Sequence, residues 1–253
     1  MIGIFDSGSG GLTVLKAVRD RLPSTDVLYF GDIKYAPYGN RSRAEISQRT
    51  MFAVRTLVER GATSLISACN STSASLAISL LDSLDLKADS IIEMVGPTVS
   101  EFRGSSARLL LAATEATIRS EIYQNAFLMI GKEVETLTIP ELAGAIEKGA
   151  PEEELERIVR DAFSSVDTRD IDAVILACTH YPLAERAFRK VLGDRIALVD
   201  PAEAVADRVE RLWWPKEVRD GKTRFLITED SAVFRERVRK LFPGAETAIE
   251  VLE

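Results

Sequence analysis

The chain contains two cysteines and one histidine, and their positions favour proton chemistry at sulfur. Cys69 and Cys178 each follow a short apolar segment ending in alanine and precede hydrogen-bonding residues, and His180 lies two positions after Cys178. A cysteine is usually a small buried hydrophobic residue. At a strand-to-helix turn, however, it meets the positive end of a helix dipole, which favours the thiolate. We therefore predict two exposed thiols with lowered pKa values.

Other cysteine chemistry is excluded by number and spacing. Cys69 and Cys178 are too far apart in sequence for a Cys-x-x-Cys redox pair. Two cysteines and one histidine are also too few for a disulfide framework or an ordinary zinc site, so we expect no metal. His180 can protonate or orient a group near the thiol, although an isolated histidine is more often structural.

Two turns near the N-terminus are candidate ligand contacts. Segment 6–11 reads DSGSGG, ends the first predicted strand and opens a helix. It lacks the third glycine of the dinucleotide fingerprint and the lysine of a P-loop, so neither nucleotide interpretation holds. Its backbone N–H groups suit a carboxylate or phosphate, unless the segment is only a tight turn. Tyr38, in the turn at 36–40, is either a core edge or a ligand contact.

Short β-branched segments alternate with helical patterns along the whole chain. This alternation is typical of βαβ units with a parallel sheet. The carboxyl edge of such a sheet is where ligands bind, and both cysteines are expected there. The predicted strands are 2–5, 27–30, 64–67, 91–95, 107–113, 136–139, 173–176, 196–199 and 225–227.

The strand series predicts two α/β lobes of parallel sheet, related by weak internal symmetry, with the site in the cleft between them. Gly96–Pro97 and the loop at 103–105 indicate a break after the fourth strand. A lone βα tail is too small to bury itself, so we expect the C-terminal segment to return to the first lobe. The predicted lobes are 1–97 plus 205–253, and 98–204.

Composition narrows the function classes. The 253 residues carry a formal net charge of -7, which argues against a nucleic-acid partner because phosphate contacts require clustered Lys and Arg. The longest apolar runs are far shorter than the roughly 20 residues that span a bilayer, and no leader pattern begins at Met1. We expect a cytoplasmic protein with no membrane partner.

Five motifs in order give the sequence a family resemblance. It resembles, over essentially its full length, the cofactor-independent glutamate racemases of the aspartate/glutamate racemase superfamily. One departure is Ser71, where the family usually has threonine; serine keeps the hydroxyl group. The motifs are FDSGSGGL at 5–12, PYG at 37–39, ACNS at 68–71, the Ala-Thr, Thr, Ser and Tyr positions within 113–123, and CTHYPL at 178–183.

The resemblance implies racemisation of L-glutamate to D-glutamate for peptidoglycan synthesis, without pyridoxal phosphate, metal or nucleotide. By position, Cys69 and Cys178 correspond to the two catalytic bases. Asp6 resembles the acid beside Cys69, His180 the partner of Cys178, and Glu147 a further acid on the Cys178 side. We also expect a homodimer. Positions matching those around the amino acid are Asp6, Ser7, Tyr38, Gly39, Asn70, Ser71, Thr117, Thr179 and His180.

Three other functions remain open from the sequence. The substrate can be another acid, such as aspartate. Cys178 and His180 can instead form a nucleophilic pair for hydrolysis or acyl transfer, which leaves Cys69 without a role. The chain can also be an amino-acid sensor without turnover, which incorporation of solvent deuterium at Cα would exclude.

Overall fold

The computed structural model describes residues 1–73, 88–213, 220–243 and 247–252. Its larger sheet has six parallel strands in the order β10-β9-β2-β1-β3-β4. Strand β10 was missed in the sequence, because a short edge strand has a weak apolar pattern. The strands are β1 (Ile2–Asp6), β2 (Val27–Gly31), β3 (Ser64–Ser67), β4 (Ile91–Glu93), β9 (Thr223–Ile227) and β10 (Thr247–Val251).

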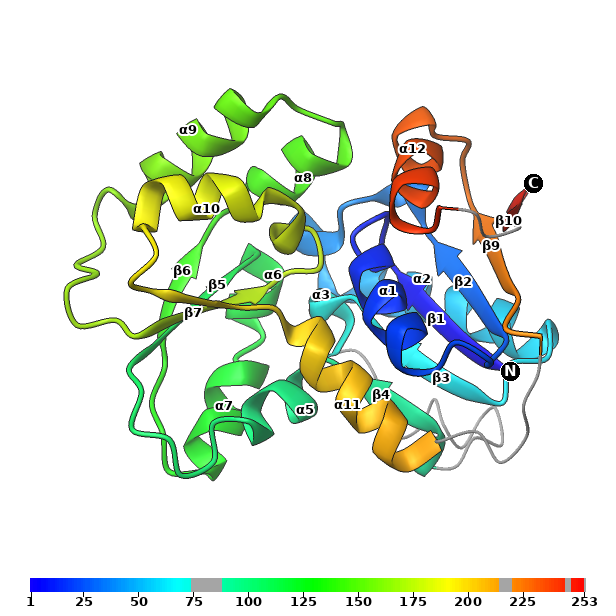
Figure 1. Ribbon diagram of the computed structural model, residues 1–253, viewed down its shortest axis with the longest axis horizontal. Coiled ribbons are helices and arrows are strands. Elements are labelled where there is room, and N and C mark those ends of the chain that lie inside the picture. The colour runs from blue at the N-terminus through cyan, green and yellow to red at the C-terminus, as the bar shows by residue number, and fades with distance from the viewer. Residues whose placement is uncertain (74–87, 214–219, 244–246, 253) are drawn as a thin grey trace.

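The smaller sheet has four parallel strands in the order β6-β5-β7-β8. Figure 1 shows the two sheets as separate lobes, and the predicted fold class is confirmed. Strand β9 pairs with β2, so the C-terminal segment adds to the first sheet. The exact lobe boundaries stay a prediction. The strands are β5 (Leu109–Ala113), β6 (Glu135–Thr138), β7 (Ala173–Ala177) and β8 (Ala197–Val199).

Helices cover both faces of each sheet, which explains why the strands read as continuous apolar runs. In the first lobe, α1 (Leu12–Arg21), α11 (Pro201–Trp213) and α12 (Ala232–Leu241) share a core on one face, and α2 (Arg43–Glu59) packs on the other. In the second, α8 (Leu142–Glu147), α9 (Glu152–Phe163) and α10 (Glu185–Leu192) oppose α5 (Val95–Ser100) and α7 (Ile122–Met129).

Several short helices and 3₁₀ turns link the longer elements. Of the helix expected after Cys69, the structure describes α3 (Asn70–Ser73). The others are α6 (Glu115–Arg119) and the 3₁₀ turns η1 (Ile33–Tyr35), η2 (Tyr38–Asn40), η3 (Ala88–Ser90) and η4 (Tyr181–Ala184). Within the described ranges, no helix is long and apolar enough to cross a membrane.

The predicted break at Gly96–Pro97 is wrong in detail. The strand ends at Glu93 instead of Val95, and Gly96 and Pro97 lie in the first turn of α5. The Glu93 carboxylate accepts hydrogen bonds from the backbone N–H groups of Val95 and Gly96, both at 2.6 Å. These donors have no partner within the helix, and a first-turn proline needs no donor of its own. A side chain therefore starts a helix where composition suggested a loop.

Candidate active site

Both cysteines lie at the carboxyl ends of strands, and the two lobes bring them to one cavity. Cys69 follows β3 and Cys178 follows β7, and their residue exposures are 5% and 6%. The cavity holds only about 10 Å³, the size of a single water site. Its lining residues are Ser7, Pro37, Tyr38, Gly39, Cys69, Asn70, Ser71, Thr114, Ala143, Cys178, Thr179 and His180.

The Cys69 thiol differs from its prediction, because it is buried and less acidic than an ordinary thiol. Burial raises the pKa of Cys69 to about 12, and the neighbouring Asp6 charge adds to the rise. The thiol donates to Ser7 Oγ at 3.6 Å, and the Ser71 N–H also favours the thiolate. Desolvation of the charged form outweighs these hydrogen bonds. Cys69 is therefore protonated in this closed arrangement.

Asp6 ties the first lobe to the loop after Cys178. Its carboxylate accepts from the Gly8 N–H at 2.9 Å and from Thr179 Oγ1 at 3.0 Å, and the residue is 1% exposed. Burial raises the pKa of Asp6, and the charge of His180 opposes the rise. The charge of Asp6 thus acts on the Cys69 thiol. Its hydrogen bond across the lobes is with Thr179, the residue after Cys178.

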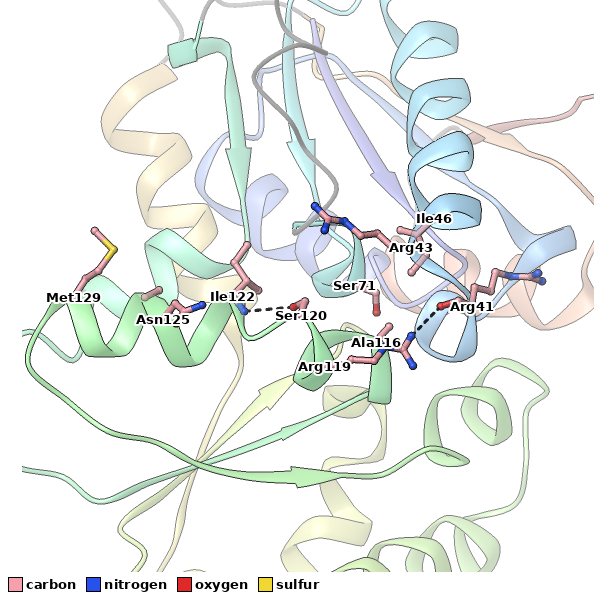
Figure 2. A pocket seen from close by; sticks show the side chains of 11 residues that line it. Arg41, Arg43, Ile46, Ser71, Ala116, Arg119, Ser120, Ile122, Asn125 and Met129 are labelled. Carbon is pink, nitrogen blue, oxygen red and sulfur yellow. Dashed lines mark hydrogen bonds between the residues drawn. The ribbon is translucent and has the colours of Figure 1, made fainter.

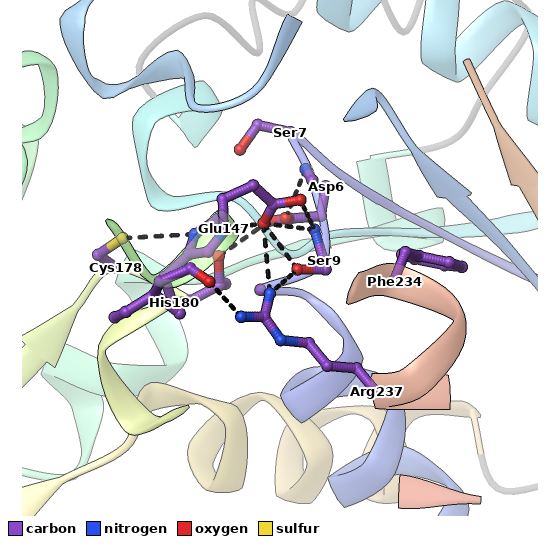
Figure 3. Close-up of polar contacts among 12 residues, drawn as sticks. Asp6, Ser7, Ser9, Glu147, Cys178, His180, Phe234 and Arg237 are labelled. Atoms are coloured by element: carbon purple, nitrogen blue, oxygen red, sulfur yellow. Dashed lines mark hydrogen bonds and ion pairs between the residues drawn. The ribbon is translucent and has the colours of Figure 1, made fainter. Parts of the chain in front are cut away.

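A chain of contacts runs from Cys178 through His180 to Glu147 (Figure 3). His180 Nδ1 lies 3.9 Å from Cys178 Sγ, and Nε2 lies 2.5 Å from Glu147 Oε2. Burial lowers the pKa of His180, but hydrogen bonds to Cys178 and Glu147 raise it to about 10. Burial raises the pKa of Glu147, but hydrogen bonds from His180 and Ser9 lower it to about 2. At neutral pH the pair is an imidazolium and a carboxylate.

Glu147 does not line the cavity; it holds His180 from behind. Its carboxylate also accepts from the Ser9 hydroxyl at 2.6 Å and from the Ser9 N–H at 3.1 Å. Ser9 belongs to the glycine-rich segment of the first lobe, so this acid joins both lobes. The family resemblance placed Glu147 on the correct side, and the structure gives it a positioning geometry.

A polar cluster forms the wall next to Cys69. Ser71 Oγ lies 3.1 Å from Thr114 Oγ1 and 3.3 Å from Thr117 Oγ1. Asn70 Oδ1 accepts from the Tyr123 hydroxyl at 2.6 Å, while Asn70 Nδ2 is buried with no hydrogen-bond partner among the described residues. Thr117 does not line the cavity and reaches it through its contacts with Ser71 and Thr114, which do. An unsatisfied buried N–H donor favours an acceptor ligand there.

Tyr38 and Gly39 line the cavity from η2, but they contribute differently. The Tyr38 hydroxyl donates to Asp32, so it is already engaged. Position 39 has no room for a side chain, because an added methyl group would lie 2.6 Å from Thr114 Cβ. The predicted site residues are thus brought together, with Asp6, Glu147 and Thr117 one contact away from the cavity.

Sequence reasoning missed Arg237, which lies on α12. Its guanidinium donates to Ser9 Oγ and to the Ile146 carbonyl, and it lies 3.6 Å from the Glu147 carboxylate. An arginine on an amphipathic surface helix carries no local signal of such a role. Only the packing of α12 beside α8 reveals it (Figures 1 and 3).

Arg237→Ala is expected to destabilise the protein by about 1–3 kcal/mol, because it leaves the Ile146 carbonyl and the buried Glu147 charge less satisfied. Chemical denaturation measures the change. Arg239→Ala removes an exposed arginine from the same helix and is the matched control. Equal stability of the two variants would show that the Arg237 contacts do not stabilise the protein.

Gly10→Ala is expected to force the lobes apart. A methyl group at Gly10 would lie 2.6 Å from Thr179 Oγ1 and 2.7 Å from His180 Nδ1. Overpacking of this kind costs about 1–3 kcal/mol. Thermal unfolding and the crystal structure of the variant test this. At Gly144 the same methyl would meet only Pro37 Cγ at 3.9 Å, so Gly144→Ala is the control and should not be destabilised.

No group of three or more His, Cys, Asp and Glu side chains in the described ranges is arranged to hold a metal ion.

The chain is similar in sequence to known racemases. The sequence profile of the Asp/Glu/Hydantoin racemase family matches residues 12–209. The glutamate racemase of Parafrankia sp. strain EAN1pec is 34% identical over 261 residues, covering 99% of this chain and 93% of that protein.

Solved structures extend the likeness over the whole fold. Glutamate racemase isoform RacE1 from Bacillus anthracis has a TM-score of 0.87 at 27% identity, covering 100% of this chain and 97% of the other. The Francisella tularensis glutamate racemase, solved in complex with D-glutamate, has a TM-score of 0.86 at 28% identity with the same coverage.

Two α/β lobes that each present a cysteine to a shared cavity define the class of this protein, and the chain belongs to the Asp/Glu/hydantoin racemase family. Within that family it is a homologue of the glutamate racemases, as its motifs indicated.

Proposed function

We propose that this protein interconverts L- and D-glutamate, using Cys69 and Cys178 as two bases on opposite faces of Cα. The observation that carries the proposal is that one thiol from each lobe lines the same cavity. Inversion at Cα requires a base on one face and a proton donor on the other. A single base would have to remove and return the proton from opposite sides without moving.

The protonation states support one direction of the reaction directly. Cys69 is held as a thiol by burial, and Cys178 lies beside the imidazolium of His180. In this direction the Cα proton passes to the Cys178 sulfur, and the Cys69 S–H proton passes to the opposite face of Cα. In the reverse direction the sulfurs exchange roles. Positioned proton transfer of this kind contributes about 10²- to 10⁴-fold.

The substrate carboxylates have neutral donors available. We assign the α-carboxylate, where charge accumulates, to Asn70 Nδ2, the Ser71 hydroxyl and the backbone N–H of Thr179. The Thr179 hydroxyl already donates to Asp6. Ser7 and Gly39, with the ring of Tyr38 as a wall, lie where the side-chain carboxylate would bind. The ammonium group is assigned to Asp6. Because the closed cavity holds only about 10 Å³, the lobes must separate to admit glutamate.

The contact chain Cys178–His180–Glu147 also favours a second candidate, a thiol hydrolase or acyl transferase. That function gives Cys69 no part, although Cys69 lines the same cavity. It predicts a covalent adduct on Cys178 that mass spectrometry detects. Racemisation predicts none.

Proton NMR of L- and D-glutamate with the enzyme in deuterated water, without added cofactor, tests the proposal. Each enantiomer should lose its Cα–H signal, and chiral analysis should show both enantiomers. Incubation with aspartate tests the alternative substrate. Glutamate that keeps its Cα–H would overturn the proposed function. Supply of D-glutamate to peptidoglycan, a cytoplasmic location and a homodimer form part of the same proposal.

A further inference from the structure

A second, much larger cavity of about 560 Å³ opens beside the active site at the junction of the two lobes (Figure 2). From the first lobe it is lined by the start of α2 and by Ser71, and from the second by α6 and α7. Ser71 also lines the cavity that holds the two cysteines. The large cavity is therefore separated from the reacting thiols by one hydroxyl-bearing side chain. We call it the vestibule.

Arginines from both lobes line the vestibule. Figure 2 shows Arg43 and Arg119 extending from opposite walls, with Ser71 between them, whereas the Arg41 guanidinium points away. None of the described residues that line it is acidic. The chain has a net charge of -7, so the vestibule is a locally positive region on a negatively charged protein.

The arginines differ in how far nearby groups neutralise them. Arg41 lies 3.5 Å from Glu45, and Arg119 lies 3.1 Å from Glu115, and neither acid lines the cavity. Arg43 pairs with no acidic side chain among the described residues. Arg119 therefore keeps donors beyond one exposed ion pair, which is weak, and among the described residues no acidic side chain offsets the charge of Arg43.

The vestibule also lies on the seam that must open. Arg119 donates to the Arg41 carbonyl at 3.4 Å, which joins the second lobe to the first at the cavity floor. Behind this contact, Ser71 bonds to Thr114 and Thr117 across the same seam. An anion entering here meets the guanidinium groups before it reaches the neutral donors around the thiols.

We propose that the vestibule is a capture site for the carboxylates of the incoming amino acid, with Arg43 and Arg119 as its binding groups. This inference rests on the proposed function, because it takes a dicarboxylate as the substrate. A cleft lined by one sign of charge raises the association rate of an opposite charge by about 10- to 10³-fold, and salt removes the effect. The site accelerates entry and takes no part in proton transfer.

The test compares Arg43→Gln/Arg119→Gln with Arg55→Gln/Arg186→Gln. The control pair removes one exposed arginine from a helix of each lobe, outside the vestibule. At low ionic strength we expect kcat/KM for glutamate to fall about tenfold in the first double variant, with kcat changed less than about twofold. In about 0.5 M NaCl the two double variants should converge, because screening removes the attraction.

Three outcomes would overturn the capture site. They are equal kcat/KM in both double variants at low salt, a loss that persists in high salt, and a loss confined to kcat. If the double variant does not fold, the same comparison is made with Arg43→Gln alone. That side chain is exposed at the start of α2, so its substitution should not disturb the fold. A wild-type enzyme without activity on glutamate would instead refute the proposed function, so the two failures are distinguishable.

Discussion

Cys69→Ser and Cys178→Ser are each expected to lower racemisation by about 10²- to 10⁴-fold while leaving the fold intact. A serine hydroxyl is a far weaker acid than a thiol, so at neutral pH it is not ionised to act as the base, and it donates its proton too slowly to replace the thiol. Both positions are buried and the substitution changes little volume. Circular dichroism and thermal unfolding should therefore differ little from the wild type.

The two variants should differ in the direction of their residual chemistry. Each retains a thiol on only one face of Cα, so in deuterated water each should exchange the Cα–H of one enantiomer faster than that of the other. The favoured enantiomer should be opposite in the two variants. The double variant Cys69→Ser/Cys178→Ser serves as the blank. Full racemase activity in either single variant would refute the two-base mechanism.

Glu147→Gln is expected to lower kcat by about 10²-fold with a smaller effect on KM, because Glu147 acts through His180 and does not line the cavity. Against the effect of burial, the hydrogen bonds to Cys178 and Glu147 and the charge of Glu147 together raise the pKa of His180. With an amide at position 147 the carboxylate charge is lost, so the pKa of His180 falls. Cys178 then lies beside a neutral ring that stabilises charge on sulfur poorly.

A direct readout is available because His180 is the only histidine in the chain. Its imidazole NMR signals should not titrate from about pH 6 to about pH 8 in the wild type, and should titrate below neutrality in Glu147→Gln. The control is Glu141→Gln, which removes an exposed carboxylate at the start of the same helix. A wild-type titration near pH 6.5 would contradict the ion pair.

The folding stability of the protein should depend on pH through the same ion pair, and the two pKa shifts set the direction of each effect. The pKa of His180 is raised from 6.5 to about 10, so its contribution is complete below pH 6.5 and is lost as pH rises through 10. The pKa of Glu147 is lowered from 4.5 to about 2, so its contribution is present above pH 4.5 and is lost as pH falls through 2. The stability difference from Glu147→Gln should be greatest between pH 4.5 and 6.5.

Local sequence determined every described strand except β10, the parallel sheets and the positions of Cys69 and Cys178 at strand ends. These features depend on residue periodicity and turn composition, which are local. Most of the polar residues around the cavity were also predictable, because their motifs follow directly after strands β1, β3 and β7. The sequence erred at Val95–Ser100, where the Glu93 carboxylate starts a helix across glycine and proline.

Only the tertiary structure decided the electrostatics of the thiols and the contacts across the lobes. The sequence predicted a lowered pKa at Cys69 from its helix, but closure of the lobes buries the sulfur, and desolvation raises the pKa instead. Arg237 and the vestibule arginines likewise have partners or neighbours far away in the chain. Residue type and spacing specify which groups are available, whereas burial and long-range proximity set their charge and their role.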